Sequence, residues 1–410
     1  MSGAIPFRTL RDLEVRGKRV VVREDLNVPI KKDAGGSDVV GDPTRIVAAL
    51  ETLRYLHEHG ARTIVLSHLG RPDGKVVEAM SLQPVAAELS KRLGLPVAFA
   101  PDCIGPAATQ AVQTLRDGDI VVLENVRFHA EEEENDPAFA KALASLGDLY
   151  VNDAFGTAHR AHASTVGIAS DLPAAAGFLM EAELRALAAL THDPRRPFVC
   201  AIGGAKVKDK VGVFKNLLDR VSSFVIGGGM ANTFLAAQGI EVGKSLRDAD
   251  LGPATEIIAL AKGRGIALHL PSDAVVSTAF DADDAAMAVP LSAIGDRMIL
   301  DIGPQTAQAY AKVLLAAKTI VFNGPMGVYE KAPYRNGTRV VGEAIAAATK
   351  GGATSVVGGG DAAAAAHELG FADAMTHVST GGGATLEFLE GKVLPGVAAL
   401  ERAAREQSAV

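Results

Sequence analysis

Short apolar runs rich in β-branched residues alternate with amphipathic helical patterns along the whole chain. Five such runs in the first half predict strands, at residues 19–22, 63–67, 97–100, 120–123 and 149–152. Six runs in the second half predict further strands, at residues 198–202, 223–226, 267–270, 298–301, 319–322 and 355–357. Alternation of this kind is typical of parallel sheets covered by helices. The chain is therefore predicted to be an α/β protein.

Chain length and one segment near the middle predict the domain organisation. A chain of 410 residues is long enough for two or three domains of about 150 residues each. Residues 173–177 are small and lead into a segment whose leucines recur at helical spacing. We expect an N-terminal domain, an interdomain helix with a hinge, and a C-terminal domain, at residues 1–172, 173–190 and 191–394.

Global properties argue against several classes of protein. No apolar run reaches the roughly 18 residues that span a bilayer, and charged residues interrupt the first 22 positions, which predicts a cytoplasmic protein without a secretory signal. A net charge of -7 argues against a nucleic-acid surface, because such surfaces neutralise many phosphates with Lys and Arg. Cys103 and Cys200 lack the spacing of a zinc site, so both are expected to be buried thiols outside any disulfide or metal site.

Three further segments have a structural interpretation. Residues 44–59 are the clearest predicted helix, with an apolar stripe formed by Ile46, Leu50, Leu53 and Leu56. Residues 31–41 are rich in glycine and charge and are predicted to form a solvent-exposed loop. The four glutamates at 131–134 are predicted to form a solvated acidic face.

Charged and polar side chains follow the predicted strands of the first half. They are Arg23, Asp25, Asn27, His68, Arg71, Arg127, His129, His159, Arg160 and His162. Ligands of open parallel sheets bind beyond the carboxyl ends of strands. Each arginine alone is more often a surface residue, but four strand ends carry one, and guanidinium groups pair bidentately with phosphate or carboxylate. Arg45 opposes a helix dipole unless an anion binds there. We expect a small anionic ligand in this half.

Glycines follow the predicted strands of the second half. The stretches lie at residues 203–210, 227–229, 323–327, 358–361 and 381–383. Such turns let backbone N–H groups approach phosphate oxygens, although any single glycine is more often a tight turn. If a helix starts near 203, Lys206 and Lys210 share one face of it. Asp361 could either cap a helix or hold Mg²⁺ beside a phosphate.

Three other functions compete with phosphoryl transfer as interpretations of this sequence. A nicotinamide-dependent dehydrogenase would also use glycine turns, and residues 358–363 fit its template, but no acidic residue follows at 378–383. A P-loop nucleotidase is disfavoured because the chain has no G-x-x-x-x-G-K-[ST] motif. A non-catalytic sensor of phosphorylated metabolites and nucleotides would use the same binding residues without turnover.

In eight motifs along nearly its whole length, the chain resembles the phosphoglycerate kinase family. They are REDLNVP at 23–29, SHLGRP at 67–72, ENVRFH at 124–129, NDAFGTAHRAH at 152–162, GGAKVKDK at 203–210, NGPMGVYE at 323–330, GGGD at 358–361 and STGGGAT at 379–385. The resemblance implies two doubly wound, Rossmann-like domains joined by an interdomain helix and hinge, with residues 395–410 returning to the N-terminal domain. It also implies a monomeric glycolytic enzyme that transfers a phosphoryl group reversibly between 1,3-bisphosphoglycerate and ADP with Mg²⁺, giving 3-phosphoglycerate and ATP.

The resemblance also implies residue roles. The implied 3-phosphoglycerate site is Asp25, Leu26, Asn27, Arg45, His68, Leu69, Gly70, Arg71, Arg127 and Arg160. The implied nucleotide site is Lys206, Lys210, Gly228, Gly229, Gly327, Glu330, Gly358, Gly359, Gly360, Asp361 and Ala362. The implied catalytic residues are Arg23, Arg45, Lys206, Gly360 and Gly383. Asp361 is implied to hold Mg²⁺.

Four residues depart from the family pattern, namely Glu24, Asn232, Ser272 and Gln305. Glu24 is expected to place an extra negative charge beside the substrate loop, and Asn232 to alter the edge of the nucleotide pocket. The acceptor carboxylate of the reverse reaction is already ionised at neutral pH, so catalysis should depend on alignment and charge neutralisation. Because the arginines and glycines belong to different halves, hinge closure is expected.

Overall fold

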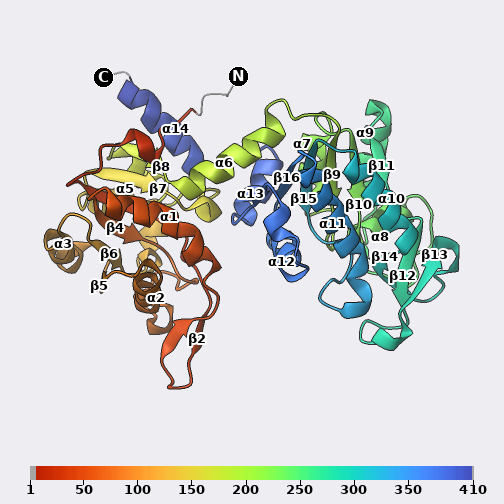
Figure 1. Cartoon of the computed structure of the whole chain (residues 1–410), viewed down its shortest axis with the longest axis horizontal. Coiled ribbons are helices and arrows are strands. Elements are labelled where there is room, and N and C mark those ends of the chain that lie inside the picture. The colour runs from red at the N-terminus through yellow and green to blue at the C-terminus, as the bar shows by residue number, and fades with distance from the viewer. Residues whose placement is uncertain (1–5, 409–410) are drawn as a thin grey trace. The chain divides into compact units, whose positions relative to one another are not determined.

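The computed structural model describes residues 6–408, which form two compact units. The first unit runs to Leu184 and includes the segment from Val393 onward, and the second is Arg185–Lys392. The division falls inside helix α6 (Phe178–Thr191), within the segment predicted as the interdomain helix. Helix α14 (Pro395–Ser408) packs against strand β8 of the first unit (Figure 1). The last two residues of the predicted segment 395–410 lie outside the described residues.

A six-stranded parallel sheet in the order β5-β6-β4-β1-β7-β8 is the centre of the first unit. Its strands are β1 (Arg19–Arg23), β4 (Arg62–Leu66), β5 (Val97–Ala100), β6 (Ile120–Leu123), β7 (Leu149–Asn152) and β8 (Ala174–Ala176). The five predicted strands are all present. Strand β8 lies in the stretch predicted to begin the hinge, because three alanines lack the β-branched signal of a strand.

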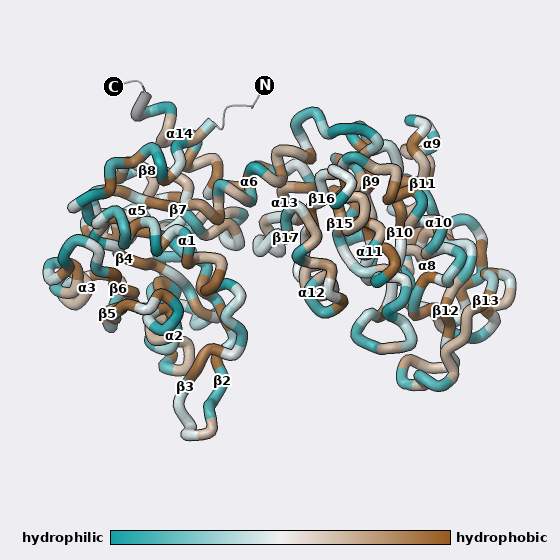
Figure 2. Tube along the Cα trace, viewed as in Figure 1, coloured by the Kyte–Doolittle hydropathy of each residue, from teal (hydrophilic) through white to brown (hydrophobic). Residues whose placement is uncertain are grey.

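Helices cover this sheet and bury the apolar stripes that the sequence predicts. They are α1 (Thr44–Glu58), α2 (Gln83–Leu93), α3 (Gly105–Gln113), α4 (Ala130–Glu133) and α5 (Pro137–Ala144), with the short 3₁₀ helices η1 (Leu10–Asp12), η2 (Glu78–Met80), η3 (Val126–Phe128), η4 (Phe155–Thr157) and η5 (Gly167–Ser170). Ile46 and Leu53 of α1 share one core cluster with Val85 and Leu89 of α2 and Val122 of β6. Burial of each such side chain contributes about 1.5–3 kcal/mol. The strongly hydrophobic strands of this sheet stand out in Figure 2.

A second six-stranded parallel sheet, in the order β11-β10-β9-β15-β16-β17, is the centre of the second unit. Its strands are β9 (Phe198–Ile202), β10 (Ser223–Ile226), β11 (Ala267–His269), β15 (Thr319–Asn323), β16 (Thr354–Val357) and β17 (His377–Val378). The helices are α7 (Val211–Leu217), α8 (Gly228–Ala237), α9 (Gly252–Arg264), α10 (Pro304–Leu315), α11 (Asn336–Lys350), α12 (Gly360–Glu368) and α13 (Gly383–Leu389), with η6 (Asp283–Ala285), η7 (Leu291–Ala293), η8 (Ala332–Tyr334) and η9 (Ala372–Ala374). The predicted α/β class is therefore confirmed.

One predicted strand lies in a different sheet from the one expected. Strand β14 (Met298–Ile302) pairs antiparallel with β12 (Asp273–Ser277), which also pairs antiparallel with β13 (Met287–Pro290). This three-stranded sheet has a small core of its own around Val276 and Ile294. An apolar run identifies a strand but not its partner, which explains the difference.

The glycine-rich segment near residue 35 is not simply a loop, as the sequence predicted. Strands β2 (Ile30–Lys32) and β3 (Asp38–Val40) pair antiparallel and form a hairpin. Asp33 holds the turn, because its side chain accepts hydrogen bonds from the amides of Gly35 at 2.8 Å and Ser37 at 2.9 Å. Most of these residues are exposed, as expected, but they are ordered by strand pairing.

Candidate active site

The parallel register brings the polar residues of the first unit to one edge of its sheet. Arg23 ends β1, where its Cα is in register with Leu66 of β4 and Asn152 of β7. The segments that follow these strands carry the arginines and histidines singled out in the sequence. This is the carboxyl edge at which open parallel sheets bind ligands.

Arg23 is completely buried and fixed by its neighbours. Its Nε donates to Ser164 Oγ at 2.8 Å, and one terminal nitrogen lies 3.1 Å from His68 Nδ1. Its other terminal nitrogen donates to the carbonyl oxygen of Glu24. A buried guanidinium held on several sides presents its charge in one orientation, which is what the recognition of a planar anion requires.

His68 is the residue on which the charges of the first unit converge. It is buried, and burial is the main reason that its pKa lies well below the usual range. The nearby charges of Arg23, Arg127, Arg45 and Arg160 lower this pKa further, in that order. His68 is therefore neutral at pH 7. Because its Nδ1 accepts from Arg23, its proton lies on Nε2, which can donate to an anionic ligand.

Further contacts join the predicted substrate residues to one another. Arg45, in the first turn of α1, forms an ion pair with Asp25. Asn27 accepts a hydrogen bond from the Gly70 amide at 2.9 Å, and Arg127 donates to the Gly70 carbonyl at 2.9 Å. The loops after β1, β4 and β6 are thus connected. The structure brings these five residues together at one edge of the sheet.

The remaining predicted substrate residues differ in exposure. Arg160 is half-buried, and its Nε lies 3.3 Å from Nε2 of His159. Arg71 is exposed on the loop after β4. Leu26 and Leu69 are buried in the core cluster under α1 and α2, so only their backbone groups are available to a ligand.

One residue of the predicted acidic face is buried, which corrects the interpretation of residues 131–134. Glu132 has no exposed surface and accepts hydrogen bonds from Ser164, at 2.8 Å from the amide and 2.6 Å from Oγ. Ser164 in turn accepts from Arg23. Charge patterning alone does not reveal this role, because Glu132 is one of four identical neighbours. The structure shows it to be the support behind Arg23.

Glu24 is also different from the expectation. Burial raises its pKa well above the usual range, and the neighbouring carboxyl of Asp153 raises it further. Asp153 is itself buried, and burial raises its pKa to about 6. It accepts a hydrogen bond from the Met180 amide at 3.0 Å, at the start of α6. This shift favours the protonated form of Glu24, which weakens the predicted extra negative charge.

In the second unit, the two predicted phosphate-binding lysines lie on an irregular turn. Helix α7 begins only at Val211, so the two lysines do not share a helical face as the sequence suggested. Lys206 is exposed. Lys210 is half-buried, and its Nζ donates to the carbonyls of Gly203 at 2.8 Å and Asn323 at 2.6 Å. Burial lowers the pKa of Lys210 to about 8, while Cys200 and then Asp361 oppose this shift.

A cavity of about 590 Å³ opens beside this turn. This volume is within the range of small-molecule sites. Five predicted nucleotide residues are among those that line it, namely Gly228, Gly229, Gly327, Glu330 and Asp361. Lys206, Lys210, Gly358, Gly359, Gly360 and Ala362 lie on the turn and at the start of α12. Gly383 is the first residue of α13.

The sequence did not predict the apolar wall of this cavity. Leu246, Phe280 and Met326 contribute to it and come from three separate segments. Asn232, one of the departures from the family pattern, lines the same wall and donates to the Leu246 carbonyl at 3.0 Å. Single apolar residues in distant segments carry no local signal, so sequence reasoning could not assemble them.

The glycines of the second unit fall into two physical groups. A Cβ on Gly327 would lie 2.3 Å from Asp301 Oδ1, and one on Gly228 would lie 2.7 Å from the Gly204 carbonyl. These glycines are required by the packing of the chain itself. A Cβ on Gly360 would meet no protein atom within 4 Å, so the chain leaves open space at the start of α12. The two helices α12 and α13 begin side by side, since a Cβ on Gly358 would lie 2.8 Å from Thr385.

Comparison with known proteins identifies the family. The family model described as phosphoglycerate kinase matches residues 10–392. The chain belongs to the phosphoglycerate kinase family. It is 55% identical over 398 residues to the phosphoglycerate kinase of Moorella thermoacetica, covering 96% of this chain and 98% of that protein. The corresponding protein of Herpetosiphon aurantiacus is 53% identical over 395 residues, covering 96% of this chain and 98% of that protein.

Solved structures agree with this family assignment. The phosphoglycerate kinase of Coxiella burnetii superposes with a TM-score of 0.88 at 42% identity, covering 97% of this chain and 100% of that one. The phosphoglycerate kinase of Pyrococcus horikoshii gives a TM-score of 0.83 at 34% identity, covering 98% of this chain and 100% of that one. The predicted family and the doubly wound fold are confirmed, and the chain is a phosphotransferase. Within residues 6–408, no helix has both the length and the hydrophobicity to cross a membrane. The monomeric state and the cytoplasmic location stay predictions.

Proposed function

We propose that this member of the phosphoglycerate kinase family transfers a phosphoryl group reversibly between 1,3-bisphosphoglycerate and ADP with Mg²⁺, giving 3-phosphoglycerate and ATP. The observation that carries this proposal is the convergence of four arginines on a neutral, buried histidine. Such a cluster suits a small ligand with both a phosphate and a carboxylate, because guanidinium groups pair bidentately with either. The apolar cavity beside the glycine-initiated helices of the second unit suits a nucleotide.

In the first unit we assign the ligand to the edge formed by Arg45, Arg127, Arg160 and His68, with Asp25 and Asn27 beside them. Arg23 is the charge nearest to His68 and is held by Ser164, so it is suited to a transferring phosphoryl group. His68 donates through Nε2 and remains uncharged. This neutral imidazole adds a hydrogen bond without adding another desolvated cation to the cluster.

In the second unit we assign the nucleotide base to the cavity, with Glu330 on the ribose and the phosphates near Lys206, Lys210 and the start of α12. Helix α12 begins at Gly360 and helix α13 at Gly383, and the positive N-terminal ends of their dipoles favour negative charge. Asp361 is an exposed carboxylate in the first turn of α12 and fits Mg²⁺, which proteins commonly bind through one or two carboxylates and substrate phosphates. Asp361 would hold the ion there, and the ion would supply neutralisation of phosphate charge.

The chemistry assigned to these residues is alignment and charge stabilisation. The acceptor carboxylate is ionised at neutral pH, so no side chain has to remove a proton from it. The neutral state of His68 agrees with this, since it acts as a hydrogen-bond donor. Transfer requires both ligands to meet, so we propose closure of the hinge during the reaction and expect scattering to show compaction when both substrates are bound.

A coupled assay tests the proposed function. ATP formation from 1,3-bisphosphoglycerate and ADP should require Mg²⁺ and stop when either substrate is omitted. Asp361→Asn should raise the Mg²⁺ concentration needed for half-maximal rate, whereas the exposed Asp373→Asn should not. A folded protein that binds both ligands and forms no ATP would instead support the sensor.

A further inference from the structure

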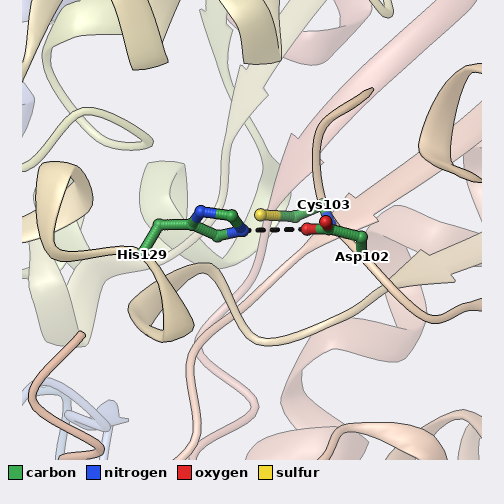
Figure 3. A group of neighbouring side chains, drawn as sticks. All are labelled: Asp102, Cys103 and His129. Carbon is green, nitrogen blue, oxygen red and sulfur yellow. Dashed lines mark hydrogen bonds and ion pairs between the residues drawn. The ribbon is translucent and has the colours of Figure 1, made fainter. Parts of the chain in front are cut away.

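Asp102, Cys103 and His129 form a cluster that the proposed reaction does not use. Asp102 and Cys103 follow strand β5, and His129 lies between η3 and α4. One potential ligand atom from each residue lies within 4.8 Å of the other two. Figure 3 shows the Cys103 sulfur pointing toward the edge of the His129 ring that faces Asp102. We propose that these three side chains form a binding site for Zn²⁺ or a similar borderline divalent cation, with water as the fourth ligand.

The three side chains already face one another. His129 Nε2 lies 2.8 Å from Asp102 Oδ1, and the Cys103 amide donates to the same carboxylate oxygen at 2.7 Å. Both hydrogen bonds fix the orientation of groups that would become ligands. Three protein ligands and one open position are common at zinc sites that retain water. Small shifts of side chains would allow the three atoms to surround one ion.

The electrostatic surroundings favour a cation at the sulfur. The Cys103 sulfur is buried, and the carboxyl groups of Asp102, Glu132 and Glu124 lie near enough to act on it electrostatically. Negative charges around the sulfur attract a divalent cation, which then stabilises the thiolate. A thiol and an imidazole together select Zn²⁺ or Co²⁺ over Mg²⁺, which prefers oxygen ligands.

Access and proton balance are compatible with binding. The Cys103 side chain is buried, but 44% of the Asp102 side chain and 27% of the His129 side chain are exposed. The ion can therefore enter from the Asp102 side, where water completes its coordination. On binding, the Cys103 sulfur forms the metal bond and releases its S–H proton to solvent. The imidazole proton moves to Nδ1, so Nε2 becomes free to bind the metal.

A metal bound at this position would link two loops of the first unit. It would join the loop after β5 to the segment after β6, and these strands are neighbours in the sheet. Arg127 of the substrate cluster lies two residues before His129. A bound ion would therefore stabilise the first unit and restrict the segment that carries Arg127. His129 lies 27 residues after Asp102, which explains why the sequence showed no zinc motif.

Titration with Co²⁺ tests the proposal on the full chain after treatment with chelator. We expect one equivalent to bind and to produce thiolate-to-cobalt charge transfer together with the intense visible bands of four-coordinate Co²⁺. Zn²⁺ should displace the Co²⁺ and raise Tm, and Mg²⁺ should do neither. Loss of a residue that hydrogen-bonds to a metal ligand typically weakens metal affinity by ~10–100-fold. Substitution of a ligand itself, as in Asp102→Asn and His129→Gln, should therefore weaken Co²⁺ affinity at least tenfold.

The second cysteine provides a matched control. Cys200 is also buried, and burial raises its pKa to about 12. Cys103→Ser should abolish the charge-transfer band and the rise in Tm, and Cys200→Ser should retain both. If Cys103→Ser does not fold, Asp102→Asn, at a partly exposed residue, replaces it in the same comparison. No spectral change at millimolar Co²⁺, or equal binding by Cys103→Ser, would overturn the proposal and leave an ordinary histidine–aspartate pair.

Discussion

Under the proposed assignment, the two units of this phosphotransferase bind negatively charged ligands in different ways. The first unit gathers guanidinium groups, and its key side chains are buried and hydrogen-bonded to one another. In the second unit, Lys206 is exposed and Lys210 is half-buried, and two helices start at glycines near an apolar cavity. Charged side chains in a network depend on each other, whereas backbone amides depend on the path of the chain. The effect of a substitution should therefore extend to neighbouring side chains in the first site and remain local in the second.

The largest expected effect concerns Lys206, the exposed lysine of the second unit. Lys206→Ala should lower kcat by ~10²–10³-fold, as the loss of one transition-state donor does, and should weaken either substrate far less. Its exposure predicts an unchanged Tm. Lys208→Ala, also exposed on the same turn, is the control and should keep normal kcat. A near-normal kcat in Lys206→Ala would mean that the assigned role is wrong.

The two groups of glycines give the next largest effect. Gly327→Ala places a Cβ against Asp301 and should reduce the free energy of unfolding by ~1–3 kcal/mol, as overpacking does. Gly360→Ala meets no protein atom, so its stability should be unchanged while its KM for nucleotide rises. Thermal unfolding and steady-state kinetics separate the two outcomes. A stable Gly327→Ala variant would show that the packing argument is incorrect.

Ser164→Ala tests whether the first site acts as a network. It removes the hydroxyl between Arg23 and Glu132, so each of these buried side chains loses one hydrogen bond. We expect a loss of ~1–3 kcal/mol in the free energy of unfolding. The KM for phosphoglycerate should rise, and the KM for ADP should not change. Ser145→Ala, at an exposed helix end, is the control. Equal effects on both KM values would contradict the separation of the two sites.

The smallest expected effect is the pH dependence of nucleotide binding. Burial lowers the pKa of Lys210 to about 8, so its positive charge is present below pH 8 and is lost as the pH rises through that value. The KM for nucleotide should therefore increase above pH 8, by a few-fold at about pH 9. Lys210→Arg keeps the charge at all these pH values and should flatten the profile. An unchanged profile in this variant would assign the titration to another group.

The sequence predicted the elements better than their partners. The β-branched runs identified the central strands of both sheets, and the polar residues after them marked the edge where Arg23 and His68 meet. The antiparallel pairing of β14 and the strand formed by the alanines of β8 depend on tertiary contacts that local patterns do not encode. The burial of Glu132 depends on Ser164, a residue 32 positions away. The family resemblance supplied the roles, and the structure supplied the neutral state of His68.

The assignment of one ligand to each unit is tested most directly by measuring the binding of both ligands to a variant of each site. Calorimetry should measure 3-phosphoglycerate and Mg²⁺–ADP separately on the wild type, Arg127→Ala and Gly360→Ala. The account predicts that Arg127→Ala weakens only 3-phosphoglycerate and that Gly360→Ala weakens only the nucleotide. If either substitution weakened the opposite ligand as strongly as its own, the assignment of one ligand to each unit would be contradicted.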